Sequence, residues 1–314
     1  MRIVVTGAAG FVGSHLSERL VALGHDVVGI DRFTDYYPRA AKEKNLERLR
    51  DEPRFSLSEV DLGTADLEPV LDGAEVIFHQ AAQPGVRASW GRTFDAYLRD
   101  NVLATQRLLE AAKSRRGSPV RRVVYASSSS VYGNIDELPM RESSVTRPFS
   151  PYGVTKLAAE HLCELYRMNH GIPTTSLRYF TVYGPRQRPD MAFHKFIVAA
   201  RRGEKIPLFG DGEQTRDFTF VGDVVEANIA AMNATEGGVF NIGGGSRVTM
   251  NQVLATLGEV VGPLNIEHGN KQLGDVNHTW ADTTRARTLL GFAPKVTLAE
   301  GLRAEAEWLS AVST

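Results

Sequence analysis

The chain begins MRIVVTGAAGFVGSHLSERLVALGHDVVGID, residues 1–31, and this stretch decides the fold. A short apolar run, Arg2–Val5, leads into a glycine-rich turn, and residues 11–23 then carry apolar side chains at helical spacing. A glycine ends that helix, and a second apolar run, Asp26–Ile30, stops at Asp31. Strand, glycine turn, helix and strand in this order predict the first unit of a parallel sheet.

The turn itself carries Gly7, Gly10 and Gly13 in the spacing G-x-x-G-x-x-G. Such glycines let the backbone approach a pyrophosphate closely, and the amides at the helix start then face the phosphates. Asp31 is placed to accept hydrogen bonds from ribose hydroxyls and would repel a 2'-phosphate. The pattern therefore predicts a dinucleotide site that prefers NAD to NADP. The alternatives are a glycine turn without a ligand and, because Arg32 follows, a phosphate contact.

Strand and helix patterns continue to alternate through the first half of the chain, which predicts an α/β doubly wound parallel sheet (Rossmann) covered on both faces. After residue 184 the rhythm loosens, and we expect a smaller, interleaved substrate domain. We place the NAD-binding domain at 1–180, with a returning segment near 215–245, and the nucleotide-sugar domain mainly at 181–314. The further expected elements are strands Phe55–Val60, Val76–His79, Arg122–Ala126, Thr174–Leu177 and Gly238–Ile242, and helices Thr93–Ser114 and Pro151–Asn169.

Composition limits the partners and the compartment. The 314 residues carry a net charge of -1 and 42% hydrophobic residues, so we expect neither nucleic acid nor a membrane as a partner. No signal peptide or spanning stretch is visible. The single cysteine, Cys163, reads as a buried helix residue, and a cytoplasmic location is expected. The histidines lack the spacing of metal ligands, so no metal is expected.

Serine, tyrosine and lysine form the candidate catalytic group. Ser128 follows the fifth expected strand, and Tyr152 and Lys156 lie four residues apart at a helix start, hence on one face. A nearby ammonium favours the phenolate, so we expect a lowered tyrosine pKa and a general base near neutral pH. Taken singly, these residues also fit a polar turn and a solvated Tyr-Lys pair. Their occurrence together, after the glycine loop, favours catalysis.

With these residues the chain resembles the extended short-chain dehydrogenases/reductases of the NAD-dependent epimerase/dehydratase family, and within it the nucleotide-sugar 4-epimerases. The resemblance implies that Ser128, Tyr152 and Lys156 are catalytic, and that dimers form through helices Thr93–Ser114 and Pro151–Asn169. The matching motifs are TGAAGFVG, Asp31, HQAAQ, SSSSVYG, SPYGVTK, RYFTVYGP, GEQTRDFTFVGDV, NIGGG and GDVNHTWAD.

The cofactor contacts follow in part from the residues and in part from this resemblance. Asp61 and Leu62 end the third expected strand and are predicted to meet the adenine edge. A helix cap for residues 65–71 is the alternative for Asp61. The resemblance places Tyr179 near the nicotinamide and Asn101 in support of the site. The full cofactor set is Gly7, Gly10, Phe11, Val12, Gly13, Asp31, Arg32, Asp61, Leu62, Ala81, Ala82, Asn101, Tyr152, Lys156 and Tyr179.

Ser129 and Ser130 help to predict which type of sugar the protein acts on. Relatives that eliminate water carry an acidic pair at the positions of Ser129 and Ser130, and decarboxylases carry a glutamate at the latter, so both reactions are disfavoured. Hydroxyls of the three serines from 128 to 130 and of Thr181 suit a carboxylate. Holding the carboxylate of a 4-keto uronate opposes loss of carbon dioxide. Arg188 is predicted to orient the same group, with an exposed loop arginine as its alternative.

The nucleotide end is interpreted through the same resemblance. Arg216 resembles the diphosphate-binding arginine, which suits two phosphate oxygens at once. Asp275 resembles a carboxylate facing ribose or arginine, and Gln272 stands where hexose epimerases have arginine. Arg87 is predicted to reach the substrate. Phe209 is predicted to stack on uracil, with a core aromatic as the alternative.

These observations predict an NAD-dependent UDP-glucuronate 4-epimerase that makes UDP-galacturonate by transient oxidation at C4, rotation of the 4-keto intermediate and re-reduction. The alternatives are a UDP-glucose 4-epimerase, a UDP-glucuronate decarboxylase and an NAD-binding regulator without turnover. The resemblance further implies a homodimer, and NAD is expected to stay bound through each cycle.

Overall fold

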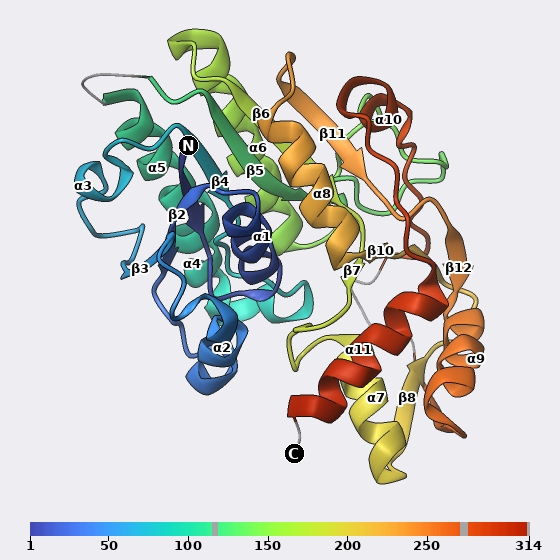
Figure 1. Ribbon diagram of the computed structural model, residues 1–314. Helices are drawn as coiled ribbons and strands as arrows, with labels where there is room; N and C mark the ends of the chain where they lie inside the picture. Colours follow the sequence, from blue (N-terminus) through green and yellow to red (C-terminus); the bar gives the residue numbers. More distant parts are fainter. Residues whose placement is uncertain (115–118, 271–275, 313–314) are drawn as a thin grey trace.

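The computed structural model describes residues 1–114, 119–270 and 276–312. Its centre is a parallel sheet of seven strands in the order β11-β6-β5-β4-β1-β2-β3 (Figure 1). This order reverses direction at β1, as in a doubly wound sheet. The strands are β1 Arg2–Thr6, β2 Asp26–Asp31, β3 Phe55–Glu59, β4 Val76–His79, β5 Arg122–Ser128, β6 Thr174–Tyr179 and β11 Gly238–Ile242.

The central strands are apolar throughout because helices cover both faces of the sheet. Val4 and Ile77 belong to a core shared with α5 and α6, whereas Ile3, Val5 and Phe78 belong to the core on the opposite face with α1 and α8. Alternate residues along a strand point to opposite faces, so a continuous apolar run serves both cores. The helices are α1 Phe11–Ala22, α5 Ala104–Ser114, α6 Pro151–His170 and α8 Val221–Met232.

The C-terminal part forms a third core beside the sheet, where α7, α9 and α11 gather around β8 (Figure 1). Tyr183 and Phe193 pack edge to face at 5.4 Å in this core. The expected division of the chain at residue 180 stays a prediction. The elements here are β7 Val182–Tyr183, α7 Ala192–Arg202, β8 Lys205–Phe209, β9 Thr215–Asp217, β10 Thr219–Phe220, β12 Arg247–Thr249, α9 Met250–Val261, β13 Asn265–Gly269, α10 Thr284–Leu290 and α11 Leu298–Val312.

The remaining short helices connect these elements. They are α2 Arg39–Asn45, α3 Glu68–Leu71 and α4 Phe94–Tyr97. None of the described helices is both long and apolar enough to cross a membrane. Cys163 is 1% exposed, as its sequence context predicted.

One expected helix does not form as a single continuous element. Thr93–Ser114 is divided into α4, a π-helical turn at Leu98–Leu103 and α5. The wider turn changes the helical phase, and Leu98 within it is exposed. The same turn carries Asn101, whose amide hydrogen-bonds Gln83 and Thr155 in the interior. This polar anchoring explains why a uniform helix does not form.

A carboxylate is buried where α11 meets the segment after β7. Oε2 of Glu305 accepts a hydrogen bond from the Gly184 amide at 2.8 Å, and Oε1 has no partner within the described chain. Burial raises the pKa of Glu305 to about 8. The side chain is therefore a neutral acid in the folded protein at pH 7.

Because this pKa lies above the unfolded value of about 4.3, the folded protein keeps a proton that the unfolded chain releases. The free energy of unfolding should therefore fall as pH rises from about 4 to 8. We expect Glu305→Gln, which does not titrate, to gain about 2–3 kcal/mol relative to the wild type between pH 5.5 and 8 in urea unfolding. Glu307→Gln, on the exposed face of the same helix, is the control. Parallel pH curves for wild type and Glu305→Gln would contradict the assignment.

Candidate active site

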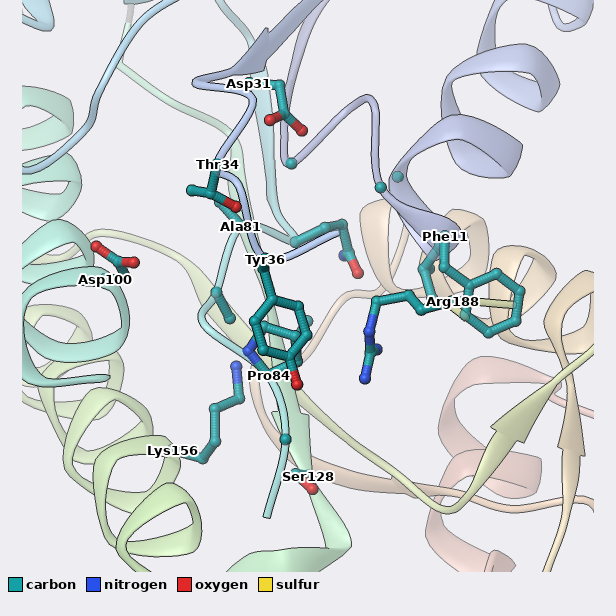
Figure 2. Close-up of a pocket in the computed structure, with 18 of the residues that line it drawn as sticks. Phe11, Asp31, Thr34, Tyr36, Ala81, Pro84, Asp100, Ser128, Lys156 and Arg188 are labelled. Carbon is teal, nitrogen blue, oxygen red and sulfur yellow. The ribbon is translucent and has the colours of Figure 1, made fainter. Parts of the chain in front are cut away.

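A cavity of about 430 Å³ lies at the carboxyl ends of the parallel strands, beside the point where the strand order reverses. Figure 2 shows Asp31 at one end of it and Ser128 at the other, with Tyr36 and Arg188 between them. The predicted site residues that line it are Gly7, Gly10, Phe11, Val12, Gly13, Asp31, Arg32, Asp61, Leu62, Ala81, Ala82, Ser128, Ser129, Ser130, Tyr152, Lys156, Tyr179, Thr181 and Arg188.

The glycine loop is closed so tightly that side chains do not fit. A Cβ on Gly13 would lie 2.1 Å from the carbonyl oxygen of Gly7, and a Cβ on Gly7 would lie 2.8 Å from the amide nitrogen of Ala81. Gly7 also has a φ of +68°. No side chain caps the N-terminus of α1 at Gly10. The first amides of this helix therefore remain available for an anion in the cavity.

The Asp31 carboxylate is oriented by two backbone amides. Oδ2 accepts from Ala9 at 3.1 Å and Oδ1 from Phe33 at 2.8 Å. Lys42 lies close by, and its ammonium donates to the carbonyl oxygen of Thr34 at 2.6 Å. A fixed carboxylate with free acceptor capacity is what a ribose diol requires.

Arg32 is already engaged by two carboxylates. It donates to Asp61 at 2.8 Å and to Asp100 at 2.5 Å. Burial alone would raise the pKa of Asp61, but Arg32 and the Gly63 amide together lower it. The helix cap considered for Asp61 is not formed, because its other oxygen binds the Gly63 amide and the helix begins only at Glu68. Arg32 is thus paired, and less available to a phosphate.

The three candidate catalytic residues converge at the other end of the cavity. Ser128 is the last residue of β5, and Tyr152 and Lys156 lie in the first turns of α6. Ser150 caps this helix through the Gly153 amide at 3.1 Å. Ser128 lies close enough to Tyr152 to lower the pKa of its phenol. The ammonium of Lys156 lies 4.6 Å from the centre of the Tyr125 ring.

The expected lowering of the tyrosine pKa by lysine is wrong for the protein without ligands. Burial raises the pKa of Tyr152, although Ser128 and the charge of Arg188 act in the opposite direction. Burial also lowers the pKa of Lys156 to about 7, so the lysine is only partly charged at neutral pH. Desolvation outweighs the attraction that the sequence pattern suggested.

A buried polar network supports this end of the site. Glu160 and Arg178 form two hydrogen bonds, at 2.6 and 3.0 Å, and Ser127 donates to Glu160 at 2.6 Å. Both side chains of the ion pair are about 5% exposed or less. A satisfied pair of this kind fixes the end of β5 against α6, and so fixes Ser128 against Tyr152.

Several residues of the site were not found from the sequence. Tyr179 hydrogen-bonds Gln80 at 3.1 Å and Asn228 at 3.0 Å, so these two side chains orient it. The motif HQAAQ contains Gln80 but predicts no role for its amide, and Asn228 lies outside the matching motifs. Further cavity residues without a prediction include Thr34, Tyr36, Tyr37, Lys42, Asp100 and Met191.

The predicted residues outside the cavity lining fall into three groups. Arg87 lies over the Phe209 ring at 4.9 Å, and Arg216 donates to the carbonyl oxygen of Asn277 at 3.1 Å. Asn101 is buried and supports the site through Thr155. Gln272 and Asp275 lie outside the described residues.

Comparisons with known proteins agree over nearly the whole chain. The model of the NAD dependent epimerase/dehydratase family matches residues 3–243. An uncharacterized UDP-glucose epimerase of Bacillus subtilis (strain 168), YtcB, is 44% identical over 316 positions, which cover 99% of each chain. The UDP-glucuronate 4-epimerase of Thermodesulfobacterium geofontis (strain OPF15) is 34% identical over 310 positions, 97% of this chain and 95% of that protein.

Among solved structures, the UDP-glucuronic acid 4-epimerase from Bacillus cereus, in complex with UDP-glucuronic acid and NAD, superposes with a TM-score of 0.95. It is 41% identical, and the match covers 99% of this chain and 100% of that one. The agreement extends through both the sheet and the C-terminal part.

Proposed function

Because the chain belongs to the NAD-dependent epimerase/dehydratase family, we propose that it is a UDP-glucuronate 4-epimerase that uses NAD to interconvert UDP-glucuronate and UDP-galacturonate. One observation carries the proposal. The cavity that joins the glycine loop to Tyr152 and Lys156 is also lined by Ser129, Ser130, Thr181 and Arg188.

The geometry of the glycine loop and of the residues around it suits binding of NAD. The uncapped helix start at Gly10 would hold the pyrophosphate, Asp31 would bind the ribose hydroxyls, and Tyr179 would contact the nicotinamide. When bound, NAD accepts a hydride from C4 of the sugar and returns it.

The chain's own residues supply the proton chemistry. Tyr152 takes the proton of the C4 hydroxyl, and Ser128 hydrogen-bonds the same oxygen. Lys156, next to Tyr152 on α6, stabilises the phenolate when protonated. After the 4-keto sugar rotates, the hydride would return to the opposite face of C4, and Tyr152 gives the proton back to the C4 oxygen.

The wall of hydroxyls distinguishes epimerisation from loss of water or carbon dioxide. The aspartates in the cavity lining are Asp31 and the Arg32 partners Asp61 and Asp100, so the described lining places no acid beside Ser128. Serine hydroxyls hold a carboxylate without donating a proton to a leaving group. Keeping that carboxylate out of alignment with the 4-keto group slows decarboxylation.

The test is incubation of the purified protein with UDP-glucuronate or UDP-glucose, without added NAD, and resolution of the products by NMR. We expect UDP-galacturonate to form and no carbon dioxide to be released. Conversion of UDP-glucose alone would support the second candidate, a UDP-glucose 4-epimerase, which the 44% identity to YtcB favours. Absence of turnover with both sugars would favour a regulator.

We further propose a cytoplasmic homodimer. Leu165 and Met168 on α6 are 53% and 69% exposed, and Leu98 and Leu103 on the neighbouring π-helical turn are also exposed. Apolar side chains gathered on two adjacent helices favour a second copy as their partner. A single, buried cysteine is compatible with a reducing compartment.

A further inference from the structure

Arg188, which lies between the Asp31 end and the Ser128 end of the cavity (Figure 2), is held by a carboxylate two residues further along the chain. Its Nε donates to Oδ1 of Asp190 at 2.9 Å, and its Nη2 donates to Oδ2 at 3.0 Å. The arginine side chain is 17% exposed and that of Asp190 36%. This fork occupies two of the five guanidinium donors and offsets the positive charge.

Tyr36 fixes the carboxylate from the other side of the cavity. Its hydroxyl donates to Oδ2 of Asp190 at 3.2 Å, and its ring centre lies 5.9 Å from the Arg188 guanidinium. The hydroxyl also abuts Gly85, where an added Cβ would lie 2.6 Å away. Tyr36 follows β2 and Arg188 follows β7, so the contact joins the cofactor side to the sugar side (Figure 2).

The positive charge of Arg188 affects Tyr152, the proposed base. It is among the influences that lower the pKa of Tyr152, and both side chains line the same cavity. A sugar whose C4 hydroxyl meets Tyr152 therefore presents its C5 substituent within electrostatic range of Arg188. A carboxylate there must compete with Asp190 for the same guanidinium.

We propose that Asp190 is a specificity-determining positioning residue: by engaging Arg188, it limits the advantage of a uronate over a neutral hexose. This rests on the proposed function. In the native site, a substrate carboxylate meets an arginine whose charge is already offset. The pairing of Arg188 with Asp190 weakens binding of a neutral hexose little, because its hydroxymethyl group needs no counter-charge. Removal of the Asp190 charge frees the guanidinium and favours the uronate alone.

The experiment measures binding by calorimetry in a Tyr152→Phe background, which prevents turnover. Dissociation constants for UDP-glucuronate, UDP-glucose and UDP are compared with and without Asp190→Asn. We expect the preference for UDP-glucuronate over UDP-glucose to rise about tenfold, the size expected for removing one charge at close range. Binding of UDP should change less than twofold. Asp190→Ala is expected to shift the preference in the same direction.

Two controls locate the effect. Glu226→Gln removes an equal charge from the exposed Arg19–Glu226 pair and should leave the preference unchanged. In an Arg188→Gln background, Asp190→Asn should change the preference less than twofold, because the competition no longer exists. A tenfold rise that persists there, or an unchanged or lower preference in the single variant, overturns the proposal. Failure of the otherwise native enzyme to convert UDP-glucuronate would instead refute the proposed function.

Discussion

Replacing Tyr152 by phenylalanine lowers kcat for UDP-glucuronate by about 10²–10⁴-fold, the contribution typical of general acid–base catalysis. The change removes one oxygen from a half-buried ring that packs edge to face with Tyr97 at 6.3 Å, so packing is kept. The C4 hydroxyl then lacks a group to take its proton as the hydride leaves. The measurement is turnover followed by NMR, together with KM.

The matched control is Tyr166→Phe, the same substitution on the same helix, where the phenol bonds Glu110 away from the cavity. It should keep kcat within twofold. Bound NAD per chain should be equal in wild type and Tyr152→Phe, since the tyrosine oxygen contributes mainly to chemistry. Turnover by Tyr152→Phe within fivefold of wild type would exclude the tyrosine as the base.

The strands were predictable because their apolar runs are bounded by turns and polar residues. The bounds expected for Val76–His79 and Gly238–Ile242 are confirmed, and the latter pairs with β6 although residues 180–237 separate the two strands in sequence. Strand β5 continues two residues beyond its expected end and carries Ser128. The sequence pattern alone does not tell whether polar residues at the end of a buried strand belong to the strand or to the following loop.

The features that could not be predicted from the sequence depend on contacts between distant segments. The π-helical turn forms where Asn101 reaches Gln83 and Thr155, and no local pattern distinguishes it from a regular helix. The pKa of Tyr152 is set first by burial, which is a property of the assembled cavity. The carboxylate of Asp190 acquires its importance only because Tyr36 is brought to it across the cavity.

Substitution of Gly13 by alanine should abolish tight binding of NAD. Its Cβ would lie 2.1 Å from the carbonyl oxygen and 2.8 Å from the carbonyl carbon of Gly7. Both are backbone atoms, so the loop must open, and the helix start then no longer faces the pyrophosphate. We expect NAD affinity to fall at least 100-fold, about 2.7 kcal/mol, and the purified protein to carry no NAD.

The matched control is Gly258→Ala in α9, where the nearest atom to an added Cβ is Leu264 Cγ at 3.8 Å. Alanine is favoured over glycine in a helix, so this variant should keep its NAD and be slightly more stable. Thermal unfolding separates loss of binding from loss of folding. Because a ligand stabilises only the state that binds it, added NAD should raise the Tm of wild type and Gly258→Ala. Gly13→Ala should unfold cooperatively with a Tm that NAD does not change, and an NAD-dependent rise equal to that of wild type would show that the loop tolerates the side chain.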